Sequence, residues 1–194
     1  MKAPRLIPFL WGWAEATFFF IVPDVWLTVL AARENTKILW RAIGWTVLGS
    51  LIGGVSMYVV GRILPPLASS ILSMVPGINV LLMLSTVSQV GEHGLVSMGL
   101  GMFTGVPYKI YAAAWGFLHG NFLQFCIATV FFRCLRFAVV GFLVKIIFVS
   151  LKKVRVSDRT KMAILVVCWA VFYVFYFQYM LSSLNLSHSQ ENYF

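Results

Sequence analysis

Two stretches of the sequence, residues 42–61 and 162–184, are strongly apolar and contain no Asp, Glu, Lys or Arg. A helix needs about 20 such residues to cross the hydrocarbon core of a bilayer, which is roughly 30 Å thick. Only 11% of the 194 residues are charged and 60% are hydrophobic, whereas a soluble domain carries charges on about a quarter of its residues. The composition therefore excludes the soluble enzyme classes and predicts an all-α integral membrane protein.

A third apolar stretch, residues 121–151, is also long enough to cross a bilayer, but it contains basic residues. Lys145 lies close enough to one end to extend its ammonium group to the interface. Arg133 and Arg136 lie deeper and need a wet cavity or a partner. The sequence thus predicts about three spanning helices, over residues 38–61, 121–151 and 162–184.

Two further apolar stretches are interrupted in the middle. Residues 9–32 are broken at Pro23-Asp24, and residues 95–118 are broken around Pro107. Proline removes a backbone donor and restricts the residue before it, so each half is expected to be a helix of about ten residues and about 15 Å, which reaches only the midplane. We therefore expect two re-entrant helical hairpins, whose breaks must be covered by protein or by a water-filled cavity.

The positions of Lys and Arg favour this arrangement. A full crossing of residues 9–32 would separate Lys2 and Arg5 from Arg33, against the tendency of basic residues to remain cytoplasmic. With a re-entrant hairpin, ten of the 15 basic residues lie on the cytoplasmic side together with the N-terminus. The tail at residues 185–194 has no Lys or Arg and is expected outside.

The order of these elements is repeated along the chain. A hairpin followed by a spanning helix occurs twice within residues 1–150, and the two copies are expected to enter from opposite faces. Inverted repeats of this kind are typical of transporters with a binding site near the midplane. Residues 65–89, which lie between the copies, are broken by Pro76-Gly77 and are expected along the outer interface or folded against the second hairpin.

Glu15 and Asp24 are the only acids in the first hairpin. A charge at this depth costs about 2.5 to 3.5 kcal/mol even on the most lenient insertion scale. One interpretation makes them proton carriers, which are neutral when they face lipid and ionised when they face water or a cation. The other is that each carboxylate pairs with a buried Arg or Lys and only holds the hairpin together.

Three basic residues are the candidates for contact with an anionic substrate. Lys109 follows Pro107 at the tip of the second hairpin, where it could bind a phosphate or form a structural ion pair with Asp24 or Glu15. Arg133 and Arg136 are three residues apart and project from one helix face, so the pair could grip a phosphate bidentately. Alternatively, Arg133 neutralises one of the two carboxylates, and Arg136 reaches an interface.

Tyr58 and Arg62 lie one turn apart near the outer end of the first spanning helix and are interpreted as an interfacial anchor that could touch a head group. The histidines His93, His119 and His188 have no mutual ligand spacing, so we expect neither a metal site nor a cofactor. The basic residues form no continuous stripe on a polar helix face, which argues against a nucleic-acid partner.

Several short motifs, in this order, resemble the DedA family, also called the VTT or SNARE-associated Golgi protein superfamily. They are Glu15 followed by Pro23-Asp24, then Gly54-x-x-x-Tyr58-x-x-Gly61-Arg62, then Pro107-x-Lys109 with Gly116. The run Arg133-Cys134-Leu135-Arg136-Phe137 is similar to the R-x-x-R-F run of the YqaA-like branch. The resemblance covers about residues 9 to 150.

The resemblance implies two opposed re-entrant hairpins and the movement of phospholipids or polyprenyl-phosphate carriers between leaflets, coupled to protons in bacteria. It also implies that Glu15, Asp24 and Lys109 are functional positions. The chain departs from the family in having only Lys109 where many members have two arginines around the proline, and Trp115-Gly116 where they have Ala-Gly. The helix expected at residues 162–184 lies outside the matched region and is interpreted as an addition for packing.

These observations predict a lipid transporter of the bacterial inner membrane rather than an enzyme. Its expected partners are membrane lipids with an anionic phosphate head group. A homo-oligomer of the chain is a further possible assembly. Two alternatives remain: a membrane-embedded lipid-modifying enzyme that uses Asp24 as nucleophile or base, and a non-catalytic membrane assembly factor.

Overall fold

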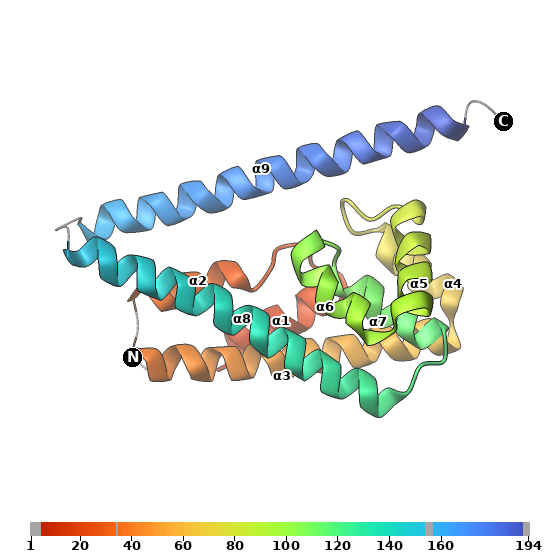
Figure 1. The fold of residues 1–194 in the computed structure, drawn as a ribbon, viewed down its shortest axis with the longest axis horizontal. Helices are drawn as coiled ribbons and strands as arrows, with labels where there is room; N and C mark the ends of the chain where they lie inside the picture. Colours follow the sequence, from red (N-terminus) through yellow and green to blue (C-terminus); the bar gives the residue numbers. More distant parts are fainter. Residues whose placement is uncertain (1–4, 34, 154–156, 192–194) are drawn as a thin grey trace.

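The structure is a computed structural model that describes residues 5–33, 35–153 and 157–191, with side chains at all of these except Phe103, Lys152, Lys153 and residues 179–191. Every regular element in the described residues is an α-helix, as predicted (Figure 1). In chain order the helices are α1 (Leu6–Thr17), α2 (Asp24–Arg33), α3 (Thr36–Ile63), α4 (Pro65–Ser73), α5 (Val80–His93), α6 (Leu95–Thr104), α7 (Tyr108–Phe117), α8 (Phe122–Lys153) and α9 (Asp158–Glu191).

Three helices in the described part of the chain are long and apolar enough to cross a membrane, which confirms the prediction of a multi-pass membrane protein. The apolar spans are Thr36–Ile63 in α3, Phe122–Leu151 in α8 and Asp158–Gln178 in α9. Helices α3 and α8 run in opposite directions (Figure 1). The most apolar part of the α3 span is 50% buried by other helices, whereas only 11% of the corresponding part of each of the other two spans is buried, so α3 is the central helix.

Helix α1 packs along α3 because glycines on α3 let the two backbones approach closely. A methyl group at Gly49 would overlap the backbone oxygen of Phe9, and one at Gly53 would lie 2.7 Å from the backbone oxygen of Trp13. These glycines form the Gly-x-x-x-Gly motif that permits close helix contact in membranes. Helix α1 therefore runs parallel to α3 and ends beside Gly53.

Helix α7 continues along the same face of α3 from the point where α1 stops. A methyl group at Gly54 would overlap the Tyr108 side chain, and one at Gly61 would overlap the backbone oxygen of Ala113. At the far end, Gly116 lies against the backbone of Tyr58. The end of α1 and the start of α7 thus meet at two adjacent glycines near the middle of α3.

Both interrupted stretches are pairs of short helices. Residues 18–23 separate α1 from α2, and residues 105–107 separate α6 from α7. Pro23 and Pro107 stand immediately before the second helix of each pair, where the missing N–H removes no helical hydrogen bond. Gly105 has a φ of 79°, a left-handed conformation that glycine adopts without steric cost.

The two pairs share one pattern of contacts. The first helix of each pair packs on the long helix that follows it in the sequence, so that α1 contacts α3 and α6 contacts α8. The second helix packs mainly on the other long helix, so that α2 contacts α8 and α7 contacts α3. The second pair therefore contacts α8 and α3 in the same way as the first pair contacts α3 and α8.

Helices α4 and α5 come from the stretch that was expected at the interface or against the second hairpin. They are separated near Gly77, whose φ is 87°. Helix α4 contacts α3 and α7, and α5 contacts α6 and α7, so both pack against the second pair.

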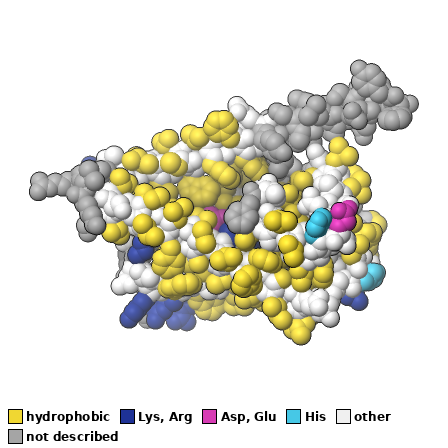
Figure 2. Space-filling model, viewed as in Figure 1, with side chains coloured by type: hydrophobic (Ala, Val, Ile, Leu, Met, Phe, Trp, Pro, Cys, Tyr) yellow, Lys and Arg dark blue, Asp and Glu magenta, His cyan; other side chains and the backbone are white. Residues whose placement is uncertain are grey.

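Exposed basic residues gather at the end of the molecule where α3 begins and α9 begins. Figure 2 shows dark blue side chains at this end and a broad hydrophobic surface over the middle. The exposed residues there include Arg33, Lys37, Arg41 and Arg159. A charged end beside an apolar belt is what the tendency of basic residues to remain cytoplasmic predicts.

Candidate functional site

Four of the six charged residues proposed as site residues from the sequence are buried in the core. The exposed fractions are 5% for Glu15, 1% for Asp24, 1% for Lys109 and 4% for Arg133. Arg133 lies about 16 Å from the start of α8 at 1.5 Å per residue, which is about half the thickness of the hydrocarbon core of a bilayer. Charges at this depth persist only when they are paired, solvated or used.

Glu15 on α1 forms a buried ion pair with Arg133 on α8. The Arg133 guanidinium also lies over the ring of Tyr108, 4.1 Å from its centroid, and 5.4 Å from the centroid of Phe137. Tyr108 is fixed in turn by a 2.9 Å hydrogen bond between its hydroxyl and the hydroxyl of Thr129. One carboxylate and two aromatic faces therefore stabilise the Arg133 cation, as one of the sequence interpretations proposed.

Asp24, the first residue of α2, pairs with Arg136 one turn further along α8. The Nη2 and Nε atoms of Arg136 donate to the same carboxylate oxygen, Oδ2, at 2.9 Å and 3.2 Å. The other oxygen, Oδ1, is buried, and no donor in the described part of the chain lies within hydrogen-bond distance of it. The Arg136 side chain is 25% exposed, so this pair is the more accessible of the two.

Lys109 forms neither of the ion pairs that the sequence left open. Its Nζ donates to the backbone oxygen of Phe19 at 2.6 Å, in the break between α1 and α2. The ion pairs found among the described residues give Glu15 and Asp24 to the two arginines instead. Lys109 thus joins the break of the first helix pair to the start of α7 in the second.

The cluster holds more positive than negative formal charge. Lys109, Arg133 and Arg136 provide three cations, whereas Glu15 and Asp24 provide two carboxylates. A carbonyl oxygen is a weaker counterpart to an ammonium group than a carboxylate is. The arrangement therefore suits an additional anion near Lys109 or Arg136.

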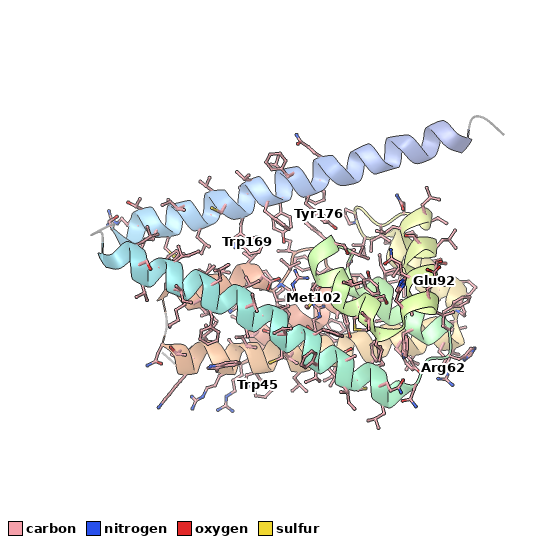
Figure 3. All side chains as sticks on the ribbon, viewed as in Figure 1. Trp45, Arg62, Glu92, Met102, Trp169 and Tyr176 are labelled. Carbon is pink, nitrogen blue, oxygen red and sulfur yellow. The ribbon has the colours of Figure 1, made fainter. Side chains whose placement is uncertain are left out.

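An apolar groove of about 520 Å³ reaches the more accessible pair. Asp24 and Arg136 lie at its wall, and the remaining lining is mostly aliphatic and aromatic side chains of α8 and α9. Trp169 on α9 and Met102 on α6 line it from two sides and are labelled in Figure 3. A smaller cavity between α6, α7 and α8 is also lined by Arg136 and by Arg133. Arg136 therefore stands between the groove and the centre of the cluster.

The remaining predicted site residues lie outside the cluster. Tyr58 is only 3% exposed and donates from its hydroxyl to the backbone oxygen of Gly120 at 2.7 Å. Arg62 donates to the Tyr58 hydroxyl at 2.6 Å. Tyr58 therefore does not reach an interface as a membrane anchor, because the corner between α3, α7 and α8 encloses it. Pro23 and Pro107 flank the cluster in the two breaks.

Sequence reasoning missed the contribution of α9. The indole N–H of Trp169 donates to the Thr28 hydroxyl at 3.0 Å, and the backbone N–H of Val22 donates to the Tyr173 hydroxyl at 3.0 Å. Tyr173 and Phe177 also pack on the ring of Phe20. Aromatic residues at 169, 173 and 177 repeat every four positions, and this spacing predicts a single helix face.

In the described residues, no group of three His, Cys, Asp or Glu side chains is arranged to hold a metal ion. Comparison with models of known protein families, with curated proteins and with solved structures finds no match to this chain. The charged cluster and the groove beside it are therefore the features of the molecule that bear on its function.

Proposed function

We propose that the protein moves a lipid with an anionic phosphate head group, either a phospholipid or a polyprenyl phosphate, from one leaflet of a membrane to the other. The observation that carries this proposal is the excess of positive charge in the cluster where the breaks of the two helix pairs meet, which the partly exposed Arg136 provides. The apolar groove that ends on Asp24 and Arg136 adds a place for hydrocarbon beside it. Both features match a lipid, which has a charged head and an apolar tail.

The contact pattern supports an inverted repeat with two re-entrant hairpins. Exchange of α3 for α8 and of the first pair for the second maps the main contacts of the short helices with the long helices onto one another, as an inverted repeat requires. Such repeats place a substrate site at the interface between the copies. The cluster occupies that place, and membership of the DedA family, proposed from the motifs, agrees with it.

The proposed cycle is an exchange of anions on Arg136. A phosphate that enters beside Arg136 replaces the Asp24 carboxylate, and Asp24 then takes up a proton because an unpaired buried carboxylate is costly. Lys109 donates to the phosphate instead of to Phe19, which releases the break between α1 and α2. When Asp24 releases this proton, the ion pair between Asp24 and Arg136 forms again and the lipid is expelled on the other side. Glu15 and Arg133 hold the framework and provide a second proton site.

The basic end of the molecule is assigned to the cytoplasm. This choice places Arg33, Lys37 and Arg41 inside together with the N-terminus, and it directs the end of α9 outwards. The membrane proposed is the bacterial inner membrane.

The test is lipid crossing in vesicles reconstituted with the purified protein. Fluorescent phosphatidylglycerol and a polyprenyl phosphate should become accessible to a quencher on the opposite face. Asp24→Asn and Lys109→Ala should each lower the crossing rate by about tenfold or more, equivalent to about 1.4 kcal/mol. Glu92→Gln and Lys37→Ala are matched controls, because both residues are exposed and lie outside the cluster.

The same vesicles separate the other functions. Chemical conversion of the lipid without crossing would replace the transporter by an enzyme. The absence of both crossing and conversion in well-folded protein would favour an assembly factor.

A further inference from the structure

A second positively charged cavity lies at the basic end of the molecule, between the end of α2, the last part of α8 and the start of α9. Its volume is about 750 Å³. Four basic residues and one acid line it, with alanines and apolar side chains between them: Arg33, Lys145, Arg159, Lys161 and Asp158. None of these residues belongs to the central cluster.

Lys161 is a buried part of the cavity lining and is held in place by an ion pair. Its side chain is only 5% exposed, and its Nζ donates to Asp158 Oδ1 at 3.0 Å. Asp158, the acid among the described lining residues, is thus already paired, whereas Arg33 and Arg159 are exposed. The described lining therefore carries the positive charge of Arg33 and Arg159, which faces outwards.

The lining of this cavity adjoins the lining of the apolar groove described above. Along α8, Lys145 lines the cavity and the preceding residue, Val144, lines the groove. On α9 the same change occurs between Met162 and Leu165, and on α2 between Ala31 and Thr28. Residues three apart lie on one helix face, so α2 and α9 each carry both linings on one face, and on α8 the two linings adjoin.

We propose that this cavity, hereafter the basic vestibule, binds the phosphate of an anionic membrane lipid while the acyl chain of that lipid lies along the groove. Lys and Arg beside a membrane attract anionic head groups. The adjoining groove offers a hydrophobic surface for the acyl chain. In the proposed function, a lipid bound in the basic vestibule would be the one that next moves to the central cluster. This role rests on the proposed function, whereas the binding of the lipid does not.

The test uses spin-labelled lipids with the label on the acyl chain, in phosphatidylcholine vesicles that contain the purified full-length protein. The fraction of labelled phosphatidylglycerol that is immobilised by the protein is compared with the fraction of labelled phosphatidylcholine. We expect the wild type to prefer phosphatidylglycerol several-fold. Arg33→Gln combined with Arg159→Gln should bring that preference close to one.

The matched control is Lys37→Gln combined with Arg41→Gln. These residues are exposed at the same end of the molecule, lose the same charge and do not line the basic vestibule. The control should keep the preference. An equal loss in the control would overturn the proposal, because general surface charge would then explain the binding. Retention of the preference in the Arg33 and Arg159 variant would also overturn it.

Two further measurements separate the remaining readings. Displacement of the labelled lipid by excess inorganic phosphate at constant ionic strength would overturn the assignment to a lipid head group in favour of free phosphate. If the wild type prefers phosphatidylglycerol but moves no lipid across vesicles, the basic vestibule stands and the proposed function fails. If lipid crosses without any such preference, the proposed function stands and the basic vestibule fails.

Discussion

The ammonium group of Lys109 lies 2.6 Å from the backbone oxygen of Phe19, so a buried cation of the second helix pair is held by the break in the first pair. No carboxylate in the described part of the chain forms an ion pair with this lysine. A buried cation that has only a carbonyl partner retains much of its desolvation cost. It is therefore the member of the cluster with most to gain from an arriving anion.

Replacement of Lys109 by methionine should separate function from stability. Lys109→Met keeps most of the apolar stem and removes a poorly compensated charge, so we expect the free energy of unfolding to change by less than about 1 kcal/mol or to rise. Lipid crossing should nevertheless be lost. Denaturant unfolding in detergent and the vesicle assay measure the two quantities. An unfolding free energy lowered by about 3 kcal/mol or more would instead make Lys109 a structural residue.

Arg133 should behave in the opposite way. Arg133→Gln leaves the Glu15 carboxylate buried without its cation and is expected to cost about 3–5 kcal/mol. Glu15→Gln in the same chain removes the orphaned charge, so the double variant should recover about 1–3 kcal/mol relative to the sum of the single changes. Unfolding of the wild type, both single variants and the double variant gives this coupling energy. Additive losses would show that the two residues do not stabilise each other.

The sequence predicted the chemistry of the cluster better than its pairing. The cost of burying Glu15 and Asp24 required partners, and the two arginines provide them. The pairing of each acid could not be chosen from the sequence, because it depends on where α1 and α2 lie against α8. The partner that Lys109 has in the structure is the backbone oxygen of Phe19. Every residue carries such an oxygen, so the sequence does not indicate which one the lysine contacts.

The fold, like the cluster, could be predicted only in part from the sequence. Long apolar stretches predicted the long helices, and proline marks the positions where the short helices separate. The contact between α9 and the first helix pair was not predicted, because an aromatic run that is apolar on all sides resembles a lipid-facing helix. Likewise, Tyr58 looked interfacial from its place near a helix end, but α7 and α8 cover it in three dimensions.

The glycines of α3 provide a matched stability test. A methyl group at Gly49 would overlap the backbone of α1, which cannot give way as a flexible side chain can, so Gly49→Ala should destabilise the protein by about 1–3 kcal/mol. Gly44 lies on the same helix with nothing within 4 Å of the added methyl group. Gly44→Ala should therefore be neutral or stabilise by up to about 1 kcal/mol. Thermal unfolding in detergent compares the two, and equal effects would contradict the close packing of α1 on α3.

The hydroxyl of Tyr173 should control the mobility of the break between α1 and α2. Tyr173→Phe keeps the ring contact with Phe20 but removes the acceptor of the Val22 N–H, and an unpaired buried donor costs about 1–3 kcal/mol. We expect faster hydrogen exchange in the peptide that contains residues 18–23, by about fivefold to a hundredfold. Tyr176→Phe is the matched control, because it removes a hydroxyl from the same helix. The ring keeps its stacking on Phe172, with 6.2 Å between centroids. Equal exchange in the wild type and in Tyr173→Phe would show that α9 lies beside the break without holding it.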